Sequence, residues 1–234
     1  MEPQELTVFD EPHPCSYLPE RTARLPLRFP QRLLTRHEFD QRLLAGDRRT
    51  GILLYRAQCP ACCACEPIRL DLERFKPNAT QRRIFRRGQR QLTLECITPV
   101  VDDQRVALFN LHRQVRGLEQ DDAAVDQGDY AEFLTDTCCE TWEMDYRLNG
   151  ELVAVAIVDA GRTSLSAVYC YYHPERTDLN LGTYSILQQV ELCRETGRRY
   201  LYLGLYIAQS THMAYKARFH PHERLINGQW QEFA

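Results

Sequence analysis

The chain has 234 residues, a net charge of −3, 44 % hydrophobic residues and 26 % charged residues, a composition that is typical of a globular protein and excludes a disordered one. It contains no run of about 18 apolar residues, so no helix is expected to cross a membrane. The acidic, polar N-terminus lacks the basic and apolar pattern of a secretion signal, and we therefore expect a cytoplasmic protein whose ten cysteines stay reduced.

The N-terminal half predicts short strands and short helices. Residues 1–30 are rich in proline and turn formers and predict an extended arm with a short strand. Thr35 and Glu38 have the spacing of a capping box and predict a short helix. Residues 51–55 and 68–72 predict two strands, and the cysteines between them are expected in the turn of a hairpin. Further along, the patterns predict a helix or turn over 81–91, a strand over 92–100 and helices over 104–117 and 130–140.

The second half predicts a different arrangement. Three strands are expected, and an Asn149–Gly150 pair between the first two is a strong hairpin signal. The predicted strands cover 143–148, 152–159 and 164–172, followed by a helix over 181–196, a strand over 200–203, a helix over 209–217 and a hairpin over 225–233. This order is typical of a GNAT-type acyltransferase core. We therefore predict an α+β protein with an N-terminal α/β lobe over residues 1–103, which carries the Cys-rich hairpin, and a C-terminal GNAT-like acyltransferase lobe over residues 104–234.

Charge is segregated along the chain. Arg69–Arg90 carries eight basic and two acidic residues, whereas Glu119–Asp145 carries ten acidic residues and neither Lys nor Arg. A polyanion is therefore expected to dock on one part only. The spacings within the basic run place most of its arginines on one side of a helix, where they suit tRNA phosphates; they are Arg82, Arg83, Arg86, Arg87 and Arg90. The alternative is that this run docks the chain's own acidic segment.

Several segments match, in chain order, the motifs of one enzyme family. In the N-terminal half they are Cys15–Pro19, Gly51–Tyr55, Cys59–Cys65 with Pro67 and Arg69, Phe75–Pro77 and Gln81–Arg83. In the C-terminal half they are Ser166–Tyr172 with Pro174, Leu181–Thr183, Tyr200–Gly204 and Met213–Lys216 with Phe219 and Pro221. With this set the chain resembles the bacterial aspartate/glutamate leucyltransferases, which are relatives of the eukaryotic arginyl-tRNA:protein transferases.

The resemblance implies an activity and its partners. It implies that leucine passes from leucyl-tRNA to the N-terminal Asp or Glu of acceptor proteins, which marks them for N-degron degradation. An arginyl donor is the alternative, because the pocket for the amino acid is not visible in the sequence. The family usually has Asn in place of Gly88 and an aromatic residue in place of Leu205, so contacts with tRNA or acceptor are expected to differ there.

The chemistry of this transfer determines which groups the enzyme needs. The ester between an amino acid and the 3′-terminal ribose of tRNA is already activated, so no cofactor is required, and the enzyme must position the acceptor amine, remove its proton and stabilise the oxyanion. Asp159, at the end of a predicted strand, is the leading candidate for the base, with Asp145 behind it. The alternative for Asp159 is a surface acid at a strand end.

Tyrosines are the other catalytic candidates. Alternation along the strand places Tyr169 and Tyr171 on one face and Tyr172 on the other, so the three cannot all line one site, and at least one is expected in the core.

A fixed cation is expected where the acidic side chain of the acceptor binds. Lys216 and Arg218 are the candidates, with a solvent-exposed helix face as the alternative. Ser166 and Tyr215, which lie in the matched segments, complete the predicted substrate-binding set.

Four cysteines form a candidate metal site. Cys59, Cys62 and Cys65 are separated by two residues each, and Cys15 is the fourth thiol that zinc or an iron–sulfur cluster prefers. The eukaryotic relatives are associated with an iron–sulfur cluster at their N-terminal cysteines, so the resemblance implies such a group here. The alternative is simple packing of reduced cysteines beside the tRNA site.

Two other functions fit parts of the sequence. A small-molecule N-acetyltransferase that uses acetyl-CoA would fit the C-terminal half alone, but the approach to the helix at 181 has a single glycine, Gly182, where a pyrophosphate loop is Gly-rich. A metal-ribbon nucleic-acid binder would fit the cysteines and arginines and would leave the C-terminal half unexplained.

Overall fold

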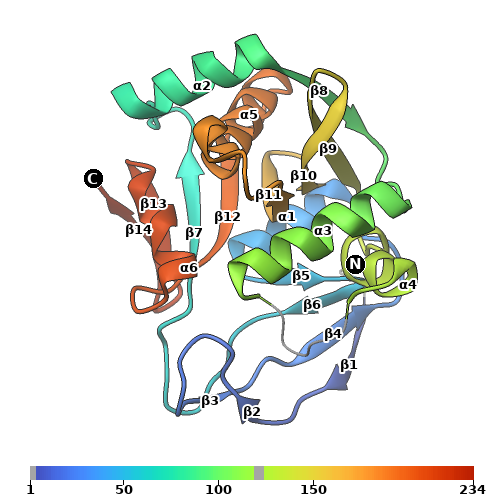
Figure 1. Cartoon of the computed structure of the whole chain (residues 1–234). Helices are drawn as coiled ribbons and strands as arrows, with labels where there is room; N and C mark the ends of the chain where they lie inside the picture. The colour runs from blue at the N-terminus through green and yellow to red at the C-terminus, as the bar shows by residue number, and fades with distance from the viewer. Residues whose placement is uncertain (1–3, 119–123) are drawn as a thin grey trace.

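The computed structural model describes residues 4–118 and 124–234. It contains an eight-stranded, a four-stranded and a two-stranded sheet, with helices packed on both faces of the largest (Figure 1). Three members of the predicted acidic segment, Glu119, Asp121 and Asp122, lie outside the described residues. Within the described ranges, no helix has both the length and the apolar character needed to cross a membrane.

The N-terminal arm contributes two strands to the four-stranded sheet, and residues 48–55 contribute the other two; the order is β1-β4-β6-β5 with antiparallel neighbours. Its strands are β1 (Glu5–Phe9), β4 (Leu27–Pro30), β5 (Arg48–Thr50) and β6 (Leu53–Tyr55), and the separate pair is β2 (His13–Pro14) with β3 (Thr22–Ala23). Helix α1 (Arg36–Leu44) begins at the predicted capping box, which is confirmed. Thr35 Oγ1 accepts from the Glu38 N–H, and Glu38 accepts from the Thr35 N–H.

The eight-stranded sheet has the order β14-β13-β7-β12-β11-β10-β9-β8. Its strands are β7 (Glu66–Asp71), β8 (Leu92–Ile97), β9 (Thr141–Leu148), β10 (Glu151–Ala160), β11 (Ser164–Tyr172), β12 (Tyr200–Tyr206), β13 (His222–Ile226) and β14 (Gln229–Phe233). Both predicted Asn-Gly hairpins are confirmed. Asn149 and Gly150 have φ values of 52° and 87°, and Asn227 and Gly228 have 51° and 77°, the positive pair that a tight hairpin turn requires.

Strands β11 and β12 are the only parallel neighbours of this sheet among the described residues, and their pairing is short. The pairing joins Ser164–Ser166 to Tyr200–Tyr202. Both strands then continue, β11 to Tyr172 and β12 to Tyr206, without pairing to each other. We call the opening beyond Ser166 and Tyr202 the splay. The splay and this order of strands confirm the predicted α+β class with a GNAT-like core.

Helices cover the two faces of the large sheet. One face packs against α2 (Ala79–Gln91) and α5 (Leu181–Glu195), and the other against α3 (Asp103–Arg116) and α4 (Gln127–Tyr130), as Figure 1 shows. α2 reaches α5 at Gly88, where a Cβ atom would lie 2.2 Å from the Tyr184 ring. An Asn at this position, as in the family pattern, would not fit this approach.

The predicted hairpin around the cysteines is wrong. β6 pairs with β4 and β5 in the small sheet, whereas β7 lies between β13 and β12 in the large one. Residues 56–65 therefore connect two sheets. Alternation identified both strands correctly, but it does not specify which neighbour a strand pairs with.

The predicted boundary between residues 103 and 104 does not separate two sheets. β7 and β8 come from the first 103 residues and lie inside and at the edge of the large sheet. The remaining N-terminal elements, the small sheet and α1, pack against the large sheet through Phe39, Leu54 and Tyr202.

Two predicted helices differ from the structure. The helix over 130–140 ends at Thr135, where the π-helical turn η1 (Ala131–Thr135) follows α4, and β9 begins at Thr141. The helix over 209–217 is a single α-turn, α6 (Thr211–Ala214), continued by the 3-10 turn η3 (Tyr215–Arg218). The basic stretch, in contrast, is a regular helix, because Asn78 and Gln81 form a capping box at its start.

Candidate active site

Two cationic side chains meet at the splay. Arg48, on β5, donates through Nη2 to the Ala167 carbonyl of β11 at 3.1 Å. Lys216, on η3, donates through Nζ to the Leu205 carbonyl of β12 at 2.8 Å and lies 3.1 Å from the Met213 sulfur. The two cations therefore bind backbone carbonyls of the two strands that separate.

Gly204 allows both cations to approach β12 closely. Its φ of +93° suits glycine, and a Cβ atom there would lie 3.2 Å from Lys216 Nζ and 3.4 Å from Arg48 Nη2. Both charged groups thus face the same side of β12, where no side chain projects.

The electrostatics of the pair are unusual. Arg48 and Lys216 are 7 % and 8 % exposed. Burial, and then the charge of Arg48, lower the pKa of Lys216 to about 7. Burial also lowers the pKa of Arg48. Neither side chain forms an ion pair with any carboxylate in the part of the chain that the structure describes.

Tyr215 precedes Lys216 on η3, and its phenol interacts with that of Tyr172. Burial, and then the neighbouring Cys170 and Tyr172, raise the pKa of the Tyr215 phenol. The Tyr172 ring packs edge-on against His112 of α3 at 4.5 Å between centroids, and His112 Nδ1 lies 3.0 Å from the Tyr172 carbonyl oxygen. A hollow of about 370 Å³ lies next to these two residues along the chain. It is lined by Leu111, Val115, His173, Pro174 and Glu175.

Tyr169 and Tyr171 lie on the opposite face of β11, as predicted from alternation. Both pack against Phe109, at centroid distances of 5.6 and 5.3 Å. Tyr171 is fully buried, and its hydroxyl lies 2.5 Å from that of Tyr130. The expectation that one of these tyrosines is a core residue is therefore confirmed for Tyr171.

Asp159 is fully buried, so its alternative interpretation as a surface acid is wrong. One oxygen accepts from Arg49 Nε at 2.7 Å and the other from Thr141 Oγ1 at 2.7 Å. This arrangement is typical of a structural ion pair, and it joins β5 of the small sheet to β10 of the large one. Asp145 is likewise engaged, by Arg105 at 2.6 Å and Arg147 at 3.2 Å.

The remaining substrate-binding candidates have different surroundings. Ser166 is buried and occupies the last paired position before the splay, opposite Tyr202. Arg218 is exposed on η3, and its carbonyl accepts from Gln81 Nε2 at 3.2 Å. The structure thus brings Ser166 and Lys216 to the splay, with Tyr215 next to Lys216, and leaves Arg218 exposed on η3.

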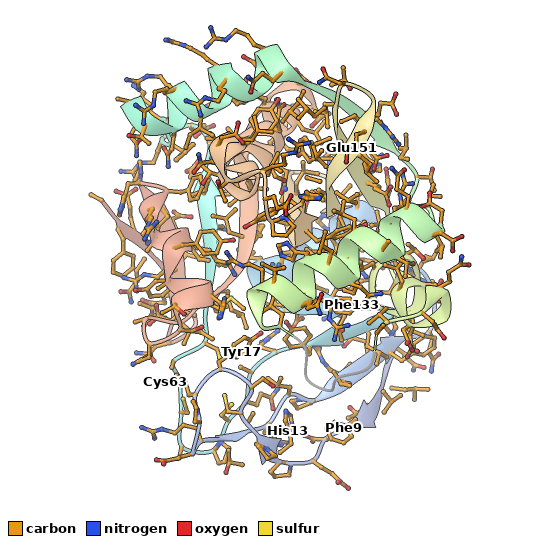
Figure 2. The ribbon with its side chains drawn as sticks, viewed as in Figure 1. Phe9, His13, Tyr17, Cys63, Phe133 and Glu151 are labelled. Carbon is orange, nitrogen blue, oxygen red and sulfur yellow. The ribbon has the colours of Figure 1, made fainter. Side chains whose placement is uncertain are left out.

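The four predicted thiol ligands lie near one another. Burial, and then the thiols of Cys59, Cys15 and Cys62, raise the pKa of Cys65 to about 12. Tyr17 interacts both with these thiols and with Arg48. Burial, and then Tyr55, Cys65 and Cys15, raise the pKa of Tyr17, whereas the charge of Arg48 lowers it. Figure 2 shows Tyr17 and Cys63 on the loops of this region. All ten cysteines are free, and no group of three or more Cys, His, Asp or Glu within the described ranges is arranged as a metal site.

The five arginines of α2 are all exposed. We call them the basic face. Three of them donate hydrogen bonds to backbone carbonyls, Arg82 to Pro77, Arg87 to Asp178 and Arg90 to Arg86. No ion pair joins the basic face to a carboxylate among residues 4–118 and 124–234. The guanidinium groups are therefore available to an external anion.

Arg48 was missed by sequence reasoning. The pair Arg48–Arg49 follows a helix and precedes a glycine, which suggests a loop, and only the pairing of β5 with β6 reveals a strand. Once that strand is known, alternation points the two arginines in opposite directions, one to Asp159 and the other to the splay.

Comparison with known proteins gives consistent matches. The family described as arginine-tRNA-protein transferase, N terminus, matches residues 13–83, and that described as arginine-tRNA-protein transferase, C terminus, matches residues 104–226. An aspartate/glutamate leucyltransferase of Chromobacterium violaceum is 38 % identical over 224 residues, which cover 94 % of this chain and 90 % of the relative. One from Saccharophagus degradans is 34 % identical over 98 % of both chains.

A solved structure shares the fold. It is the C-terminal domain of a protein described as a lysylphosphatidylglycerol synthetase of Agrobacterium fabrum, with a TM-score of 0.52 and 17 % identity over 72 % of this chain and 58 % of that chain. At this identity the likeness concerns the fold alone.

Proposed function

Since the chain belongs to the arginine-tRNA-protein transferase family, we propose that it moves leucine from leucyl-tRNA to the N-terminal Asp or Glu of acceptor proteins. The observation that carries this proposal is the match, along nearly the whole chain, to relatives named aspartate/glutamate leucyltransferases. The added leucine marks the acceptor for N-degron degradation. Because aminoacyl-tRNA is a cytoplasmic substrate, we place the reaction in the cytoplasm.

The reaction is the aminolysis of an ester. The acceptor's α-amine attacks the ester carbonyl carbon, an amide C–N bond forms, and the ester C–O bond breaks. The terminal ribose hydroxyl of the tRNA leaves with the proton that the amine gives up. Since an α-amine has a pKa of about 8, a modest base or a chain of water molecules suffices near neutral pH. We place this chemistry at the splay, with Ser166, Tyr215 and Lys216 lining the acceptor side and Arg218 at the rim.

We assign a supporting role to the three predicted catalytic residues. Asp159 is held by Arg49 and Thr141, and Tyr171 by Tyr130. Tyr169 packs on the same face as Tyr171. These contacts fix β10 and β11, and so they set the position of the splay rather than touch the reacting atoms.

We assign tRNA binding to the basic face. Exposed guanidinium groups on one helix suit phosphates, because Arg binds them through two parallel hydrogen bonds and counterion release adds to the affinity. The absence of ion pairs between these arginines and the described acidic residues supports this assignment over internal docking.

We also retain the cysteines as ligand candidates for zinc or an iron–sulfur cluster. The donors fit chemically, since four thiols lie near one another, but they do not surround a common point among the described residues. No step of the transfer uses a metal. Metal analysis of protein purified without oxygen, compared with Cys65→Ser, tests this proposal, and an equal metal content in both would contradict it.

The function is tested by incubating the purified protein with radiolabelled leucyl-tRNA or arginyl-tRNA and peptides that begin with Asp, Glu, Lys or Ala. We expect label from leucyl-tRNA in the Asp and Glu peptides alone. Label from arginyl-tRNA only, or transfer to Lys peptides only, would contradict the proposed donor or acceptor. Acetylation from acetyl-CoA without leucine transfer would replace the proposed reaction.

A further inference from the structure

The pair formed by Arg48 and Lys216 lacks a counter-ion within the described chain. Burying a charge is costly unless a partner of opposite charge compensates it. The groups that interact with Arg48 are the phenols of Tyr55 and Tyr202, the carboxylate of Asp159 and the guanidinium of Arg49. Asp159, the carboxylate among these groups, is already bound to Arg49 and Thr141.

The geometry of the pair suits an anion that enters the splay. Arg48 is bound to β11 and Lys216 to β12, and the two charged groups converge over Gly204, where the absence of a side chain lets both approach the strand closely. A guanidinium fork beside an ammonium group matches the two oxygens of a carboxylate. A carboxylate between them would also reduce the repulsion through which Arg48 lowers the pKa of Lys216.

On the basis of the proposed function, we propose that Arg48 and Lys216 together bind the side-chain carboxylate of the acceptor's N-terminal Asp or Glu, and that Arg48 is a specificity-determining residue for this acidic side chain. The carboxylate and the α-amine belong to the same residue. Holding the first therefore places the second at the splay, where the aminoacyl ester is expected. The tRNA phosphates are assigned to α2 instead, because its arginines are exposed and a phosphate bound there stays hydrated.

The test compares acceptor peptides that differ only in charge. Transfer of leucine by the full-length protein is measured with peptides beginning with Asp or Asn and with Glu or Gln. For Arg48→Gln we expect the Asp-to-Asn ratio of kcat/KM to fall by about 10- to 100-fold, mainly through KM, because a lost charged hydrogen bond has that magnitude. The kcat/KM for the Asn peptide is expected to fall much less than that for the Asp peptide, because the amide carries no charge for Arg48 to bind. Arg48→Lys, which keeps the charge but not the fork, is expected to retain part of the ratio.

Two further variants complete the design. Lys216→Met is expected to lower the same ratio, and it stands in for Arg48→Gln if that protein does not fold. Arg162→Gln is the matched control, because Arg162 is exposed and has no side-chain ion pair among the described residues. It is expected to keep the wild-type ratio.

The outcomes separate the alternatives. Equal losses with Asp and Asn peptides would assign Arg48 a purely structural role and overturn the inference. A higher KM for leucyl-tRNA with an unchanged Asp-to-Asn ratio would assign the pair to the tRNA end instead. If the wild-type protein transfers no leucine to any peptide, the proposed function itself fails. If it transfers leucine without preferring Asp over Asn, only the acidic specificity fails.

Discussion

Neighbouring buried arginines on β5 have opposite electrostatic surroundings. Arg49 has a counter-ion, Asp159, and the two charges compensate each other at the junction of the sheets. Arg48, the preceding residue, has none and lies beside Lys216. Because Arg49 has its counter-ion within the chain, substitution of Arg49 is expected to lower the stability. Because Arg48 has none, substitution of Arg48 is expected to weaken acceptor binding.

Replacing Asp159 tests the ion pair between Arg49 and Asp159. Asp159→Asn is expected to lower the free energy of unfolding by about 3–5 kcal/mol, since Arg49 would remain buried without its counter-ion. The turnover of the protein that remains folded is expected to stay near that of the wild type. Urea unfolding and kcat measurements on the same preparation check this, and a large fall in kcat at wild-type stability would restore Asp159 as the base. Arg49→Leu combined with Asp159→Leu is expected to recover most of the stability.

Lys216 is expected to make stability depend on pH. Its pKa is about 7 in the folded protein and 10.5 when exposed, so between these values the unfolded chain holds a proton that the folded chain lacks. The contribution of Lys216 to the free energy of unfolding therefore rises with pH between these two pKa values, and it is lowest below about pH 7. Relative to Lys216→Met, the wild-type free energy of unfolding is expected to rise by up to about 1.4 kcal/mol per pH unit. Urea titrations from about pH 7 to pH 9 measure this slope.

The other lysine is the control for this titration. Lys76 is exposed, so Lys76→Met is expected to show the same pH dependence as the wild type. Parallel stability curves for wild type and Lys216→Met would show that Lys216 remains charged in the folded protein.

At the scale of elements, α2 combines an inner packing face with an outer binding face. Gly88 approaches the Tyr184 ring, and Phe85 lies 6.0 Å from the same ring between centroids. Because α5 holds the inner side so closely, the basic face points outward as a unit. Substitutions in the basic face are therefore expected to change the salt dependence of the affinity for tRNA rather than the free energy of unfolding.

The double variant Arg82→Ala with Arg83→Ala tests this face. The slope of log affinity for leucyl-tRNA against log salt is expected to become shallower by about one unit for each lost phosphate contact. Filter binding at several salt concentrations gives the slope. Arg21→Ala with Arg162→Ala removes two exposed arginines elsewhere and is expected to leave it unchanged. An unaltered slope in the α2 variant would assign its arginines to another partner.

At the scale of the whole molecule, the large sheet depends on distant parts of the chain. β7 supplies the strand between β13 and β12, and β8 forms the far edge. Without them, β12 would lose an antiparallel neighbour and β13 its only link to the rest of the sheet. The segment that matches the C-terminal family description from residue 104 is thus not a complete sheet.

A fragment covering residues 104–234 is consequently expected not to fold cooperatively by itself. Thermal unfolding followed by circular dichroism is expected to show no sharp transition, because unpaired strand edges would remain in the middle of the sheet. Addition of a fragment covering residues 1–103 is expected to restore the transition and transferase activity. A sharp transition of the isolated fragment would mean that the predicted boundary at residue 103 marks two independent domains.

Local sequence patterns determined much of this protein. The Asn-Gly hairpins, the capping box of α1, the helical spacing of the arginines and the shared face of Tyr169 and Tyr171 depend on residues a few positions apart, whose geometry the backbone itself constrains. The order of elements and the family motifs also identified the acyl-transfer core and the activity before any contact was known.

Only the tertiary structure decided which strands pair and which charges meet. Alternation shows which face a residue takes but not which strand lies beside it, so the insertion of β7 into the large sheet was not predicted. Asp159 meets Arg49 across 110 positions, and Arg48 meets Lys216 from opposite ends of the chain. Such encounters follow from how the sheets pack, because burial and partners, rather than residue type, decide whether an acid is a free base or half of an ion pair.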